Sequence, residues 1–293
     1  MRTVSVILNR SSGSAAAKIE ALQSLVANAG LKADVLQVSG AEITTAALRA
    51  ARAGHVLVAA GGDGTASTVA GVAVRNGATF GVIPLGTLNH FARDAGIPLE
   101  LDKAVATIAA GGTRALDVGL MNDATFLNNV SLGLYPQLVW ERQREQSRGR
   151  RKSVAFLIAL VRTWRHYPTV GVHMTVDNVE LLRRTPFVFI GNGEYHAEGM
   201  DLGTRASLNS GTLSVYLAPG VGRLEFLQLP IRALRGRLRD AVKFESFPAC
   251  DVRIETRGRL IDVALDGELR SEKTPLRCTI RRGALTTLVP QGT

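Results

Sequence analysis

Cysteine is scarce in this sequence of 293 residues. The two cysteines, Cys250 and Cys278, are far apart, and neither belongs to a Cys-x-x-Cys or mixed Cys/His pattern. Such patterns mark zinc sites, so their absence argues against structural zinc. A chain of this length also needs no disulfide to stabilise its fold. Both observations are typical of a protein of the reducing cytoplasm.

Long apolar runs are missing as well. The longest uncharged one, Val154–Val161, is far shorter than the ~20 residues that cross a bilayer as a helix. Near the N-terminus, the apolar segment Val4–Leu8 is too short for the core of a signal peptide, and we interpret it as a strand. We therefore expect no transmembrane segment, and we expect any contact with a membrane to be peripheral.

Aromatic and acidic residues are few. Aromatics make up 5% of the chain, and 25 acidic residues stand against 35 basic ones, which gives a net charge of +10. This excess favours an acidic partner, such as nucleotide phosphates, nucleic acid or an anionic membrane surface. No basic segment is interleaved with aromatics in the manner that stacks bases, so we expect no nucleic acid partner. The 46% of hydrophobic residues suffice for one large domain or two ordinary ones.

A glycine-rich turn after an apolar run is the most informative stretch of the sequence. Residues Val56–Thr65 read Val-Leu-Val-Ala-Ala-Gly-Gly-Asp-Gly-Thr, and an apolar segment predicted as a helix, Ala66–Arg75, follows. Glycines let backbone amides approach phosphate oxygens, and the N-terminus of a helix attracts anions. Asp63 carries a carboxylate that can bind Mg²⁺ or a hydroxyl group. The pattern predicts a strand, a phosphate-binding loop and a helix.

Strands alternate with helices in the first part of the chain, which predicts a parallel sheet with both faces covered. In such a sheet the loops at the carboxyl ends of the strands lie at one edge. We therefore expect Asn9–Gly13, Gly61–Thr65 and Gly86–Asn89 to converge on one crevice. The predicted strands are Val4–Leu8, Ala33–Val38, Val56–Gly61 and Thr79–Pro84, and the predicted helices before the glycine turn are Ala15–Ala29 and Ile43–Ala53.

Short strand-like segments broken by Gly, Pro and Asn replace this alternation from about Asp117 onward, and they predict a mostly antiparallel second domain. We place the domains at residues 1–118 and 119–293, with the last strand able to pack back on the first domain. Two helices are expected in the second part, one over Val154–Trp164 after an arginine-rich stretch and one over 224–239. The expected strands are Phe126–Leu132, Phe187–Ile190, Leu213–Leu217, Val252–Glu255, Leu260–Leu265, Leu276–Ile280 and Leu285–Val289.

Four further motifs accompany the glycine turn. They are Asn9–Gly13, Pro84–Arg93, Asn128–Gly133 and the late acidic element Asp266-Gly267-Glu268. Gly-Gly-Asp-Gly-Thr alone is shared with NAD kinases, so these neighbouring motifs carry the distinction. Asn9–Gly13 resembles the Asn-Pro-x-Ser-Gly, and Pro84–Arg93 the Pro-x-Gly-Thr-x-Asn-Asp-Phe-Ala-Arg, of the diacylglycerol kinase catalytic family. With the motifs in family order, the sequence resembles this family, and within it bacterial YegS-like and DagK-like soluble lipid kinases, relatives of sphingosine and ceramide kinases.

The resemblance implies a fold of two domains. The first would be a doubly wound nucleotide domain like that of phosphofructokinases and NAD kinases, and the second a β-sandwich, with the active site in the cleft between them. It also implies ATP and Mg²⁺ as cofactors, with Asp63 engaging the metal. The residues implied to surround the nucleotide are Asn9, Gly61, Gly62, Asp63, Gly64, Thr65, Gly86, Thr87 and Asn89.

The catalytic residues that the resemblance implies are Glu268, Asp266 and Asp63. A carboxylate can accept the proton of a hydroxyl group, which makes Glu268 the candidate general base. Asp266 would orient Glu268 or assist the metal. The alternative is that Asp266-Gly267 is a plain hairpin turn, because Asp-Gly is a frequent two-residue hairpin loop.

Several departures from the family pattern keep other functions open. Ser67-Thr68 and His90 stand where the family often has Asn-Glu and Asp, and Asn209–Leu213 lacks the carboxylate of an accessory magnesium loop. We expect an ATP-dependent kinase of a lipid hydroxyl, either diacylglycerol or a related glycerolipid or sphingoid, that is cytoplasmic and peripherally bound to the inner face of the membrane. The alternatives are an NAD kinase-like enzyme and a catalytically silent lipid- or nucleotide-binding regulator.

The segment Trp140–Trp164 has two interpretations. Its arginines could contact anionic headgroups while its apolar residues guide an acyl chain, as in a lid or surface helix. Alternatively, it is an amphipathic helix that only packs on the sandwich, with a solvated basic segment before it.

Overall fold

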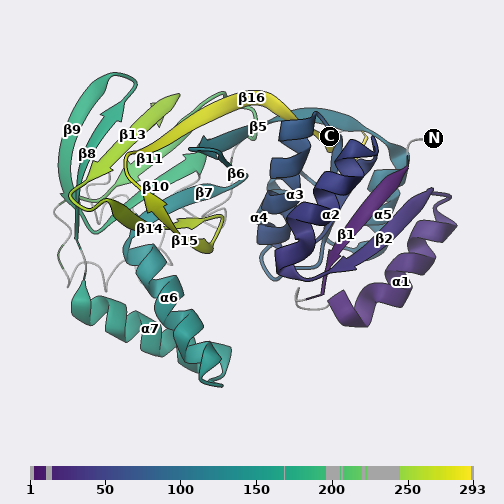
Figure 1. Ribbon diagram of the computed structural model, residues 1–293, viewed down its shortest axis with the longest axis horizontal. Helices are drawn as coiled ribbons and strands as arrows, with labels where there is room; N and C mark the ends of the chain where they lie inside the picture. The colour runs from purple at the N-terminus through teal and green to yellow at the C-terminus, as the bar shows by residue number, and fades with distance from the viewer. Residues whose placement is uncertain are drawn as a thin grey trace. The chain divides into compact units, whose positions relative to one another are not determined.

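The computed structural model describes residues 3–10, 15–167, 169–195, 205, 207–219, 222 and 245–291. The chain divides into two compact units, whose elements are labelled in Figure 1. Unit 1 comprises Met1–Val118, Ala124–Asn128 and Arg281–Thr293, and unit 2 comprises Gly119–Asp123 and Asn129–Ile280. The helix expected over 224–239 lies outside the described residues.

Unit 1 is built on a parallel sheet in the order β2–β1–β3–β4, with helices on both faces. The doubly wound first domain is therefore confirmed. Its strands are β1 (Val4–Asn9), β2 (Ala33–Val38), β3 (Val56–Gly61) and β4 (Phe80–Pro84). Its helices are α1 (Ala15–Asn28), the short η1 (Gly40–Glu42), α2 (Ile43–Arg52), α3 (Asp63–Asn76), α4 (His90–Asp94) and α5 (Leu101–Ala110).

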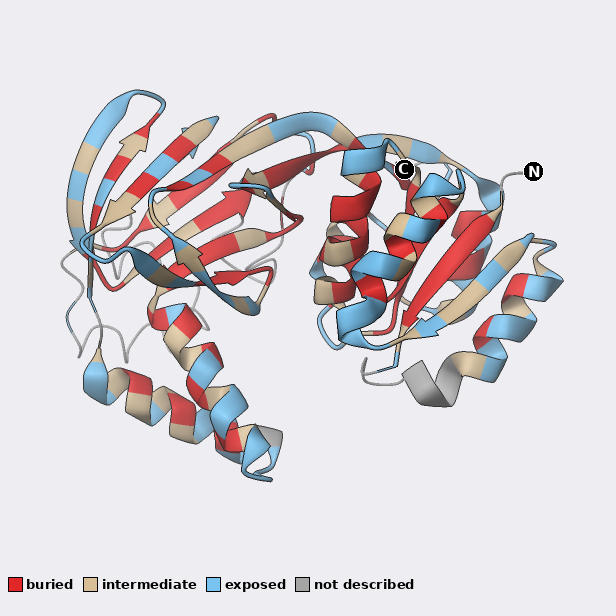
Figure 2. Ribbon diagram, in the orientation of Figure 1, coloured by how far each residue is buried: buried red, intermediate tan, exposed pale blue. Residues whose placement is uncertain are grey.

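The core of unit 1 follows from the alternation of side chains along its strands. Val6 and Val58 face a cluster that includes Leu22 of α1 and Ile108 of α5. Successive residues of a strand point to opposite faces, so the fully buried Leu57 lies on the face covered by α2 and α3. Figure 2 shows the resulting buried central strands.

Unit 2 contains a six-stranded antiparallel sheet in the order β12–β11–β10–β7–β14–β15 and a second antiparallel group, β16–β13–β8–β9, which together form the predicted sandwich. The first group consists of β7 (Asn129–Gly133), β10 (Phe187–Asn192), β11 (Leu213–Leu217), β12 (Glu245–Ala249), β14 (Leu260–Leu265) and β15 (Glu268–Lys273). The second consists of β8 (Val170–Val176), β9 (Val179–Thr185), β13 (Asp251–Thr256) and β16 (Leu276–Leu288).

Three expected boundaries were wrong. The helix after the glycine turn begins at Asp63 and not at Ala66. The strand expected over Phe126–Leu132 is two strands, β6 (Ala124–Phe126) and β7, of which β6 pairs with β5 (Thr113–Met121). The two strands expected at the end of the chain are the single strand β16, which runs on through Arg281, Arg282 and Gly283, the last with a positive φ of 57°.

β16 contributes residues to both units. Its first part pairs with β13 in antiparallel register, with Leu276 opposite Ile254. Its last part returns to unit 1, where Thr287 pairs in parallel with Phe80 of β4. Within unit 1, the buried Asp117 carboxylate accepts a hydrogen bond from the Gly283 amide (2.7 Å). This bond fixes the strand near the point where it enters unit 1.

A hairpin of two helices, α6 (Leu134–Ser147) and α7 (Lys152–His166), extends from the sandwich after β7 (Figure 1). Only the second helix was expected, and it begins two residues before the predicted Val154. No helix in the described part of the chain is both long and apolar enough to cross a membrane.

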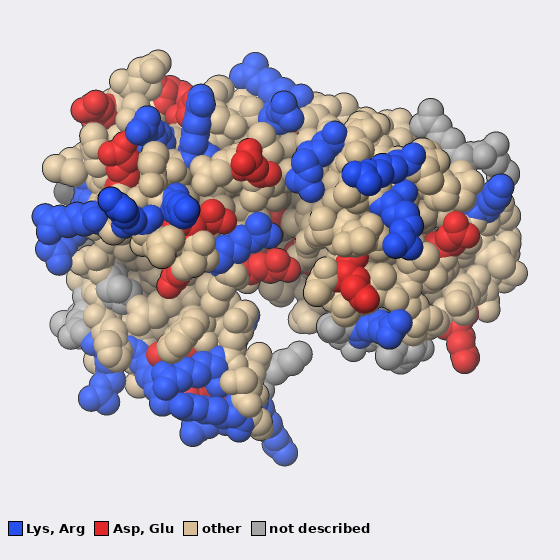
Figure 3. Space-filling model, viewed as in Figure 1, with Lys and Arg blue, Asp and Glu red and all other residues tan. Residues whose placement is uncertain are grey.

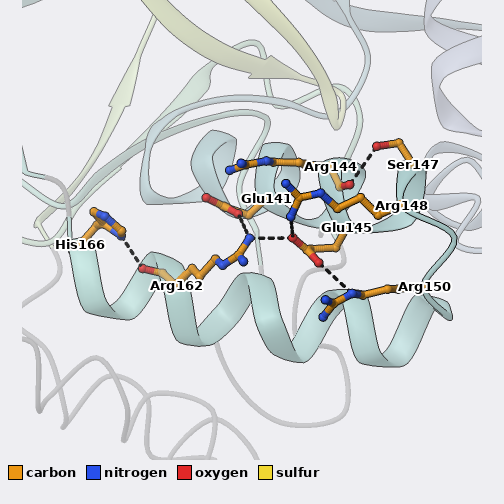
Figure 4. A network of polar contacts seen from close by, with 8 residues as sticks. All are labelled: Glu141, Arg144, Glu145, Ser147, Arg148, Arg150, Arg162 and His166. Carbon is orange, nitrogen blue, oxygen red and sulfur yellow. Dashed lines mark hydrogen bonds and ion pairs between the residues drawn. The ribbon is translucent and has the colours of Figure 1, made fainter.

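Ion pairs between buried glutamates and partly exposed arginines stabilise the hairpin, and those of Arg162 join its two helices (Figure 4). The side chain of Glu145 on α6 is fully buried, and it contacts Arg148 (2.9 Å), Arg150 (3.1 Å) and Arg162 (2.6 Å). Arg162 of α7 also contacts Glu141 (3.1 Å). Burial alone would raise the pKa of Glu145, but Arg150, Arg162 and Arg148 outweigh it and hold the pKa below its ordinary value.

We expect Glu145→Gln to destabilise the protein at neutral pH, because it leaves the arginines without their charged partner. The pKa of Glu145 is lowered in the folded state, so its contribution is present above the unfolded value near 4.5 and is lost as pH falls below it. Urea unfolding at several pH values should show a wild-type advantage that shrinks below about pH 4.5. Glu20→Gln, at an exposed position of α1, is the control. A difference that is independent of pH would contradict this role.

Candidate nucleotide and acceptor sites

Two glycine-containing loops of unit 1 touch through their backbones. A Cβ atom on Gly86 would lie 2.5 Å from the Cα of Gly62, which no ordinary packing allows. A Cβ atom on Gly61 would lie 2.5 Å from the hydroxyl oxygen of Thr65. The Leu85 amide donates to the Gly61 carbonyl oxygen (2.9 Å), which fixes the end of β4 beside the end of β3. Glycine is therefore required at position 86 for the loops to meet, and at position 61 it leaves room for the Thr65 side chain.

Two asparagines hold these loops in place. Asn9, the last residue of β1, donates from Nδ2 to the Thr65 hydroxyl oxygen (3.0 Å). Asn89 has a left-handed backbone (φ 51°), and its side chain accepts from the Gly86 amide (3.0 Å) and donates to the Gly86 carbonyl oxygen (2.9 Å). The structure thus brings together residues from the carboxyl ends of β1, β3 and β4. Thr87 lies exposed between Gly86 and Asn89.

The N-terminus of α3 faces this group of loops, with Gly62 as its N-cap. The first amides of a helix have no acceptor within the helix, and the helix dipole adds partial positive charge there. Asp63 is in the first turn, and its Oδ1 accepts from the Phe91 amide at the start of α4 (3.3 Å). This bond ties the beginning of α3 to the beginning of α4. The arrangement can bind an anion and place a carboxylate beside it.

Arg93 is a further residue of this site, for which the sequence motifs predict no role. Its Nε donates to the Leu88 carbonyl oxygen (3.0 Å), so its guanidinium lies against the Gly86–Asn89 loop. His90, which replaces the family's Asp, is exposed at the first position of α4. The signal for Arg93 was its place in the same motif, three residues after His90.

The acidic element of unit 2 is a tight hairpin turn. Asp266 and Gly267 connect β14 to β15, both have positive φ (48° and 83°), and Leu265 pairs with Glu268. These features define a type I′ turn. The buried Asp266 carboxylate accepts from the Asn129 amide (2.8 Å), and its own amide donates to the Asn129 carbonyl oxygen (2.9 Å). Asp266 thereby fastens the hairpin to the start of β7.

Glu268 is differently placed from Asp266. Its side chain is about half exposed (53%), and its carboxylate is 3.9 Å from the Arg270 guanidinium. An exposed carboxylate at the end of a rigid turn can take a proton from a hydroxyl group that reaches it. A hairpin turn and a role of Glu268 as general base are therefore compatible, because the turn fixes the position from which the Glu268 side chain projects.

Two adjoining hollows lie in unit 2. The larger, of about 990 Å³, extends from β8 and β9 to β14 and is lined in part by Leu182, Leu260 and Ile261. The smaller, of about 490 Å³, lies beside α6 and is lined in part by Trp140 and Leu269. Val170, Ile261 and Asp262 line both. Together they provide an apolar recess of a size that suits a hydrocarbon chain.

The loop Asn209–Leu213 is held by hydroxyl groups. Ser210 donates to the Thr212 carbonyl oxygen (3.2 Å) and accepts from the Thr212 amide (3.4 Å), and Gly211 has a positive φ. Among the described residues, no group of three or more His, Cys, Asp and Glu side chains is arranged to bind a metal ion.

Comparison with protein families assigns both units. Residues 3–121 match the diacylglycerol kinase catalytic domain, and residues 130–289 match the YegS C-terminal NAD kinase beta sandwich-like domain. These two domains in succession define the class of YegS-like and diacylglycerol kinase-like lipid kinases. The chain belongs to this family.

Curated relatives align with little more than half of the chain. An uncharacterized protein of Synechocystis, sll0036, is 29% identical over 59% of this chain and 40% of its own length. The protein named probable lipid kinase YegS in Salmonella gallinarum is 31% identical over 57% of each chain. The alignments thus cover less than two thirds of these relatives.

Solved structures share the whole fold. The crystal structure of a diacylglycerol kinase from Bacillus anthracis superposes with a TM-score of 0.74 at 21% identity, covering 99% of this chain and 97% of that one. A further structure from the same organism has a TM-score of 0.78 at 22% identity, with coverages of 99% and 95%. At such identity the likeness establishes the fold.

We expect Gly86→Ala to separate the two glycine loops, because the added methyl group collides with the Gly62 backbone and with Asn89 Oδ1 (2.8 Å). Overpacking of this kind costs about 1–3 kcal/mol of unfolding free energy, measurable by urea denaturation. Gly40→Ala is the matched control, since nothing lies within 4 Å of its added Cβ atom and its φ is not positive. Equal stability of the two variants would contradict the close approach of the loops.

Proposed function

We propose that this protein is an ATP-dependent kinase that transfers the γ-phosphate to a lipid hydroxyl group, diacylglycerol or a related glycerolipid or sphingoid. The observation that carries the proposal is the convergence of Asn9, Gly61–Thr65 and Gly86–Asn89 at the N-terminus of α3. Family membership supports the lipid as acceptor. The reaction would take place at the cytoplasmic face of the membrane.

The nucleotide would be bound by unit 1. The backbone amides of the glycine loop and the start of α3 suit phosphate oxygens, and Gly86 with Thr87 and Asn89 forms the adjoining wall. Asp63 has the oxygen chemistry that Mg²⁺ requires, and its position in the first turn of α3 fits a metal that accompanies the phosphates. Mg²⁺ would neutralise charge on the phosphates during transfer.

The acceptor would be activated by unit 2. Glu268 would accept the hydroxyl proton while the hydroxyl oxygen bonds to the γ-phosphorus, and the bond from that phosphorus to the bridging oxygen breaks to leave ADP. Asp266 would act as a positioning residue through its bond to the Asn129 amide. The hollows lined by Leu182 and Leu269 would hold the acyl chains.

A transfer assay tests the reaction directly. Purified protein with γ-labelled ATP and Mg²⁺ should phosphorylate a lipid in a panel of diacylglycerol, ceramide, sphingosine, phosphatidylglycerol and NAD. Label in NAD alone would establish an NAD kinase-like enzyme instead. No transfer to any acceptor, with ATP still bound, would favour the silent regulator.

Asp63→Asn and Glu268→Gln should each lower turnover by about 100-fold or more, because one weakens metal binding and the other removes the proton acceptor. Glu268→Gln should leave ATP affinity nearly unchanged, as measured by calorimetry. Glu272→Gln, four residues along the same strand, is the matched control and should retain wild-type turnover. Wild-type rates from Glu268→Gln would leave only the hairpin role for this turn.

Replacing Asp266 separates positioning from metal binding. Asn tolerates the left-handed backbone and keeps an oxygen that can accept from the Asn129 amide, whereas Ala does neither. If Asp266 only positions the turn, Asp266→Asn should keep most of the turnover. Asp266→Ala should lose about 1 kcal/mol of unfolding free energy by leaving the partly buried Asn129 amide without its acceptor. A loss of activity in Asp266→Asn as large as in Asp63→Asn would indicate a metal ligand.

A further inference from the structure

The helix α7 carries its apolar side chains on the side opposite to its partner helix. The face toward α6 is small and polar, with Ala155, Ala159 and Thr163 buried and Arg162 paired to Glu141 and Glu145. Large apolar residues cover the opposite side. Their exposed fractions are 46% for Val154, 61% for Leu157 and 47% for Val161, with Phe156 at 45% on the flank. An ordinary surface helix has the reverse arrangement.

The hairpin is also the most basic part of the chain. Residues 134–166 contain eight Lys or Arg and two Glu, which is a net charge of +6 out of +10 for the whole protein. Figure 3 shows basic side chains gathered over the hairpin. Exposed arginines include Arg144 on α6 and Arg151 at the N-cap of α7.

Both acidic residues of the hairpin are turned inward. Glu141 and Glu145 are buried, and both are paired with arginine within the hairpin. The lowered pKa of Glu145 keeps it charged at neutral pH, so its pairing is maintained. The outer side of α7 therefore combines exposed apolar side chains with the exposed Arg165, four residues after Val161 on the same side of the helix, and presents neither carboxylate.

A tryptophan on the exposed surface of α6 lies at the apolar recess of unit 2. Trp140 on α6 is 50% exposed and lines the smaller hollow. The Arg144 guanidinium lies over its ring, 5.1 Å from the ring centre. Tryptophan suits the boundary between headgroups and hydrocarbon because its ring is apolar and its N–H is polar.

We propose that the outer face of the α6–α7 hairpin docks on an anionic phospholipid bilayer, with Leu157 and Val161 entering the interface and the arginines contacting phosphate groups. The proposal rests on the proposed function, since it names the membrane surface from which the lipid would be taken. Charge decides against a second copy of the chain, because two hairpins, each with a net charge of +6, would repel each other. An anionic bilayer supplies both the hydrocarbon and the negative charge that this face lacks.

Vesicle co-sedimentation of the full chain, without nucleotide, tests the docking. Vesicles of phosphatidylcholine and phosphatidylglycerol in equal parts should bind the protein, and vesicles of phosphatidylcholine alone should bind it much less. Leu157→Ser and Arg151→Glu should each weaken binding about 10-fold. Added salt should weaken binding by the wild type, because it screens the arginines.

Matched controls come from unit 2 itself. Val179→Ser changes an apolar residue of β9 that is 60% exposed, and Arg259→Glu makes the same change of charge in an exposed turn. Both should bind vesicles as the wild type does. Circular dichroism should show that all four variants are folded.

The outcomes separate docking from catalysis. If Leu157→Ser and Arg151→Glu bind vesicles as the controls do, the docking proposal is wrong, whatever the kinase assay shows. If they lose vesicle binding but phosphorylate a short-chain, water-soluble diacylglycerol normally, docking and kinase function both stand. If vesicle binding depends on the hairpin and no acceptor is phosphorylated, docking stands and the proposed function fails. A dimer that Leu157→Ser dissociates, with vesicle binding unchanged, would assign the face to a second copy.

Discussion

The candidate nucleotide site depends on the backbone contact between Gly62 and Gly86. Because Gly86 has no side chain, the turn after β3 and the turn after β4 lie against each other and form one surface at the N-terminus of α3. The other features of the site follow from that contact. Asn89 can bond to both polar backbone groups of Gly86, and Asp63 can reach the Phe91 amide, only while the two loops stay together. Rigidity here serves binding, because a preformed cradle loses less entropy when a phosphate enters.

Most of unit 1 could be predicted from the sequence, since apolar strands alternating with helices leave few topologies. Unit 2 was harder. Strands β8 and β9 were missed because β9 is an edge strand with exposed Glu180 and Arg184 and a partly exposed Arg183, so its apolar pattern is weak. A tight turn joins β8 to β9, and its residues Asp177 and Asn178 have positive φ angles. This Asp-Asn pair was the signal in the sequence for a hairpin of two strands. Helix α6 was missed because its second half is almost entirely polar and is held by ion pairs to α7, which no local pattern reveals.

The acidic turn shows why a structural and a functional interpretation need not compete. Asp266 is fixed by two hydrogen bonds to Asn129, which is what a hairpin that must keep its register requires. The same bonds fix the position of Glu268, the first residue of β15, which follows Asp266 by two residues. A general base works only within hydrogen-bond reach of its proton, so a rigid turn is a suitable support for it. The sequence motif could suggest both roles, and the geometry accommodates both.

Glu145 likewise has two effects in the α6–α7 hairpin. A buried carboxylate surrounded by three arginines contributes little net stability compared with a well-packed apolar contact, because desolvation opposes the charge attraction. It does, however, neutralise Arg162 on the inner side of α7, and the small residues Ala155 and Ala159 let the helices come close. The large apolar side chains are then left for the outer side. Large apolar side chains that face water stabilise nothing. A lipid surface beside an apolar recess can take up these side chains and bind the arginines.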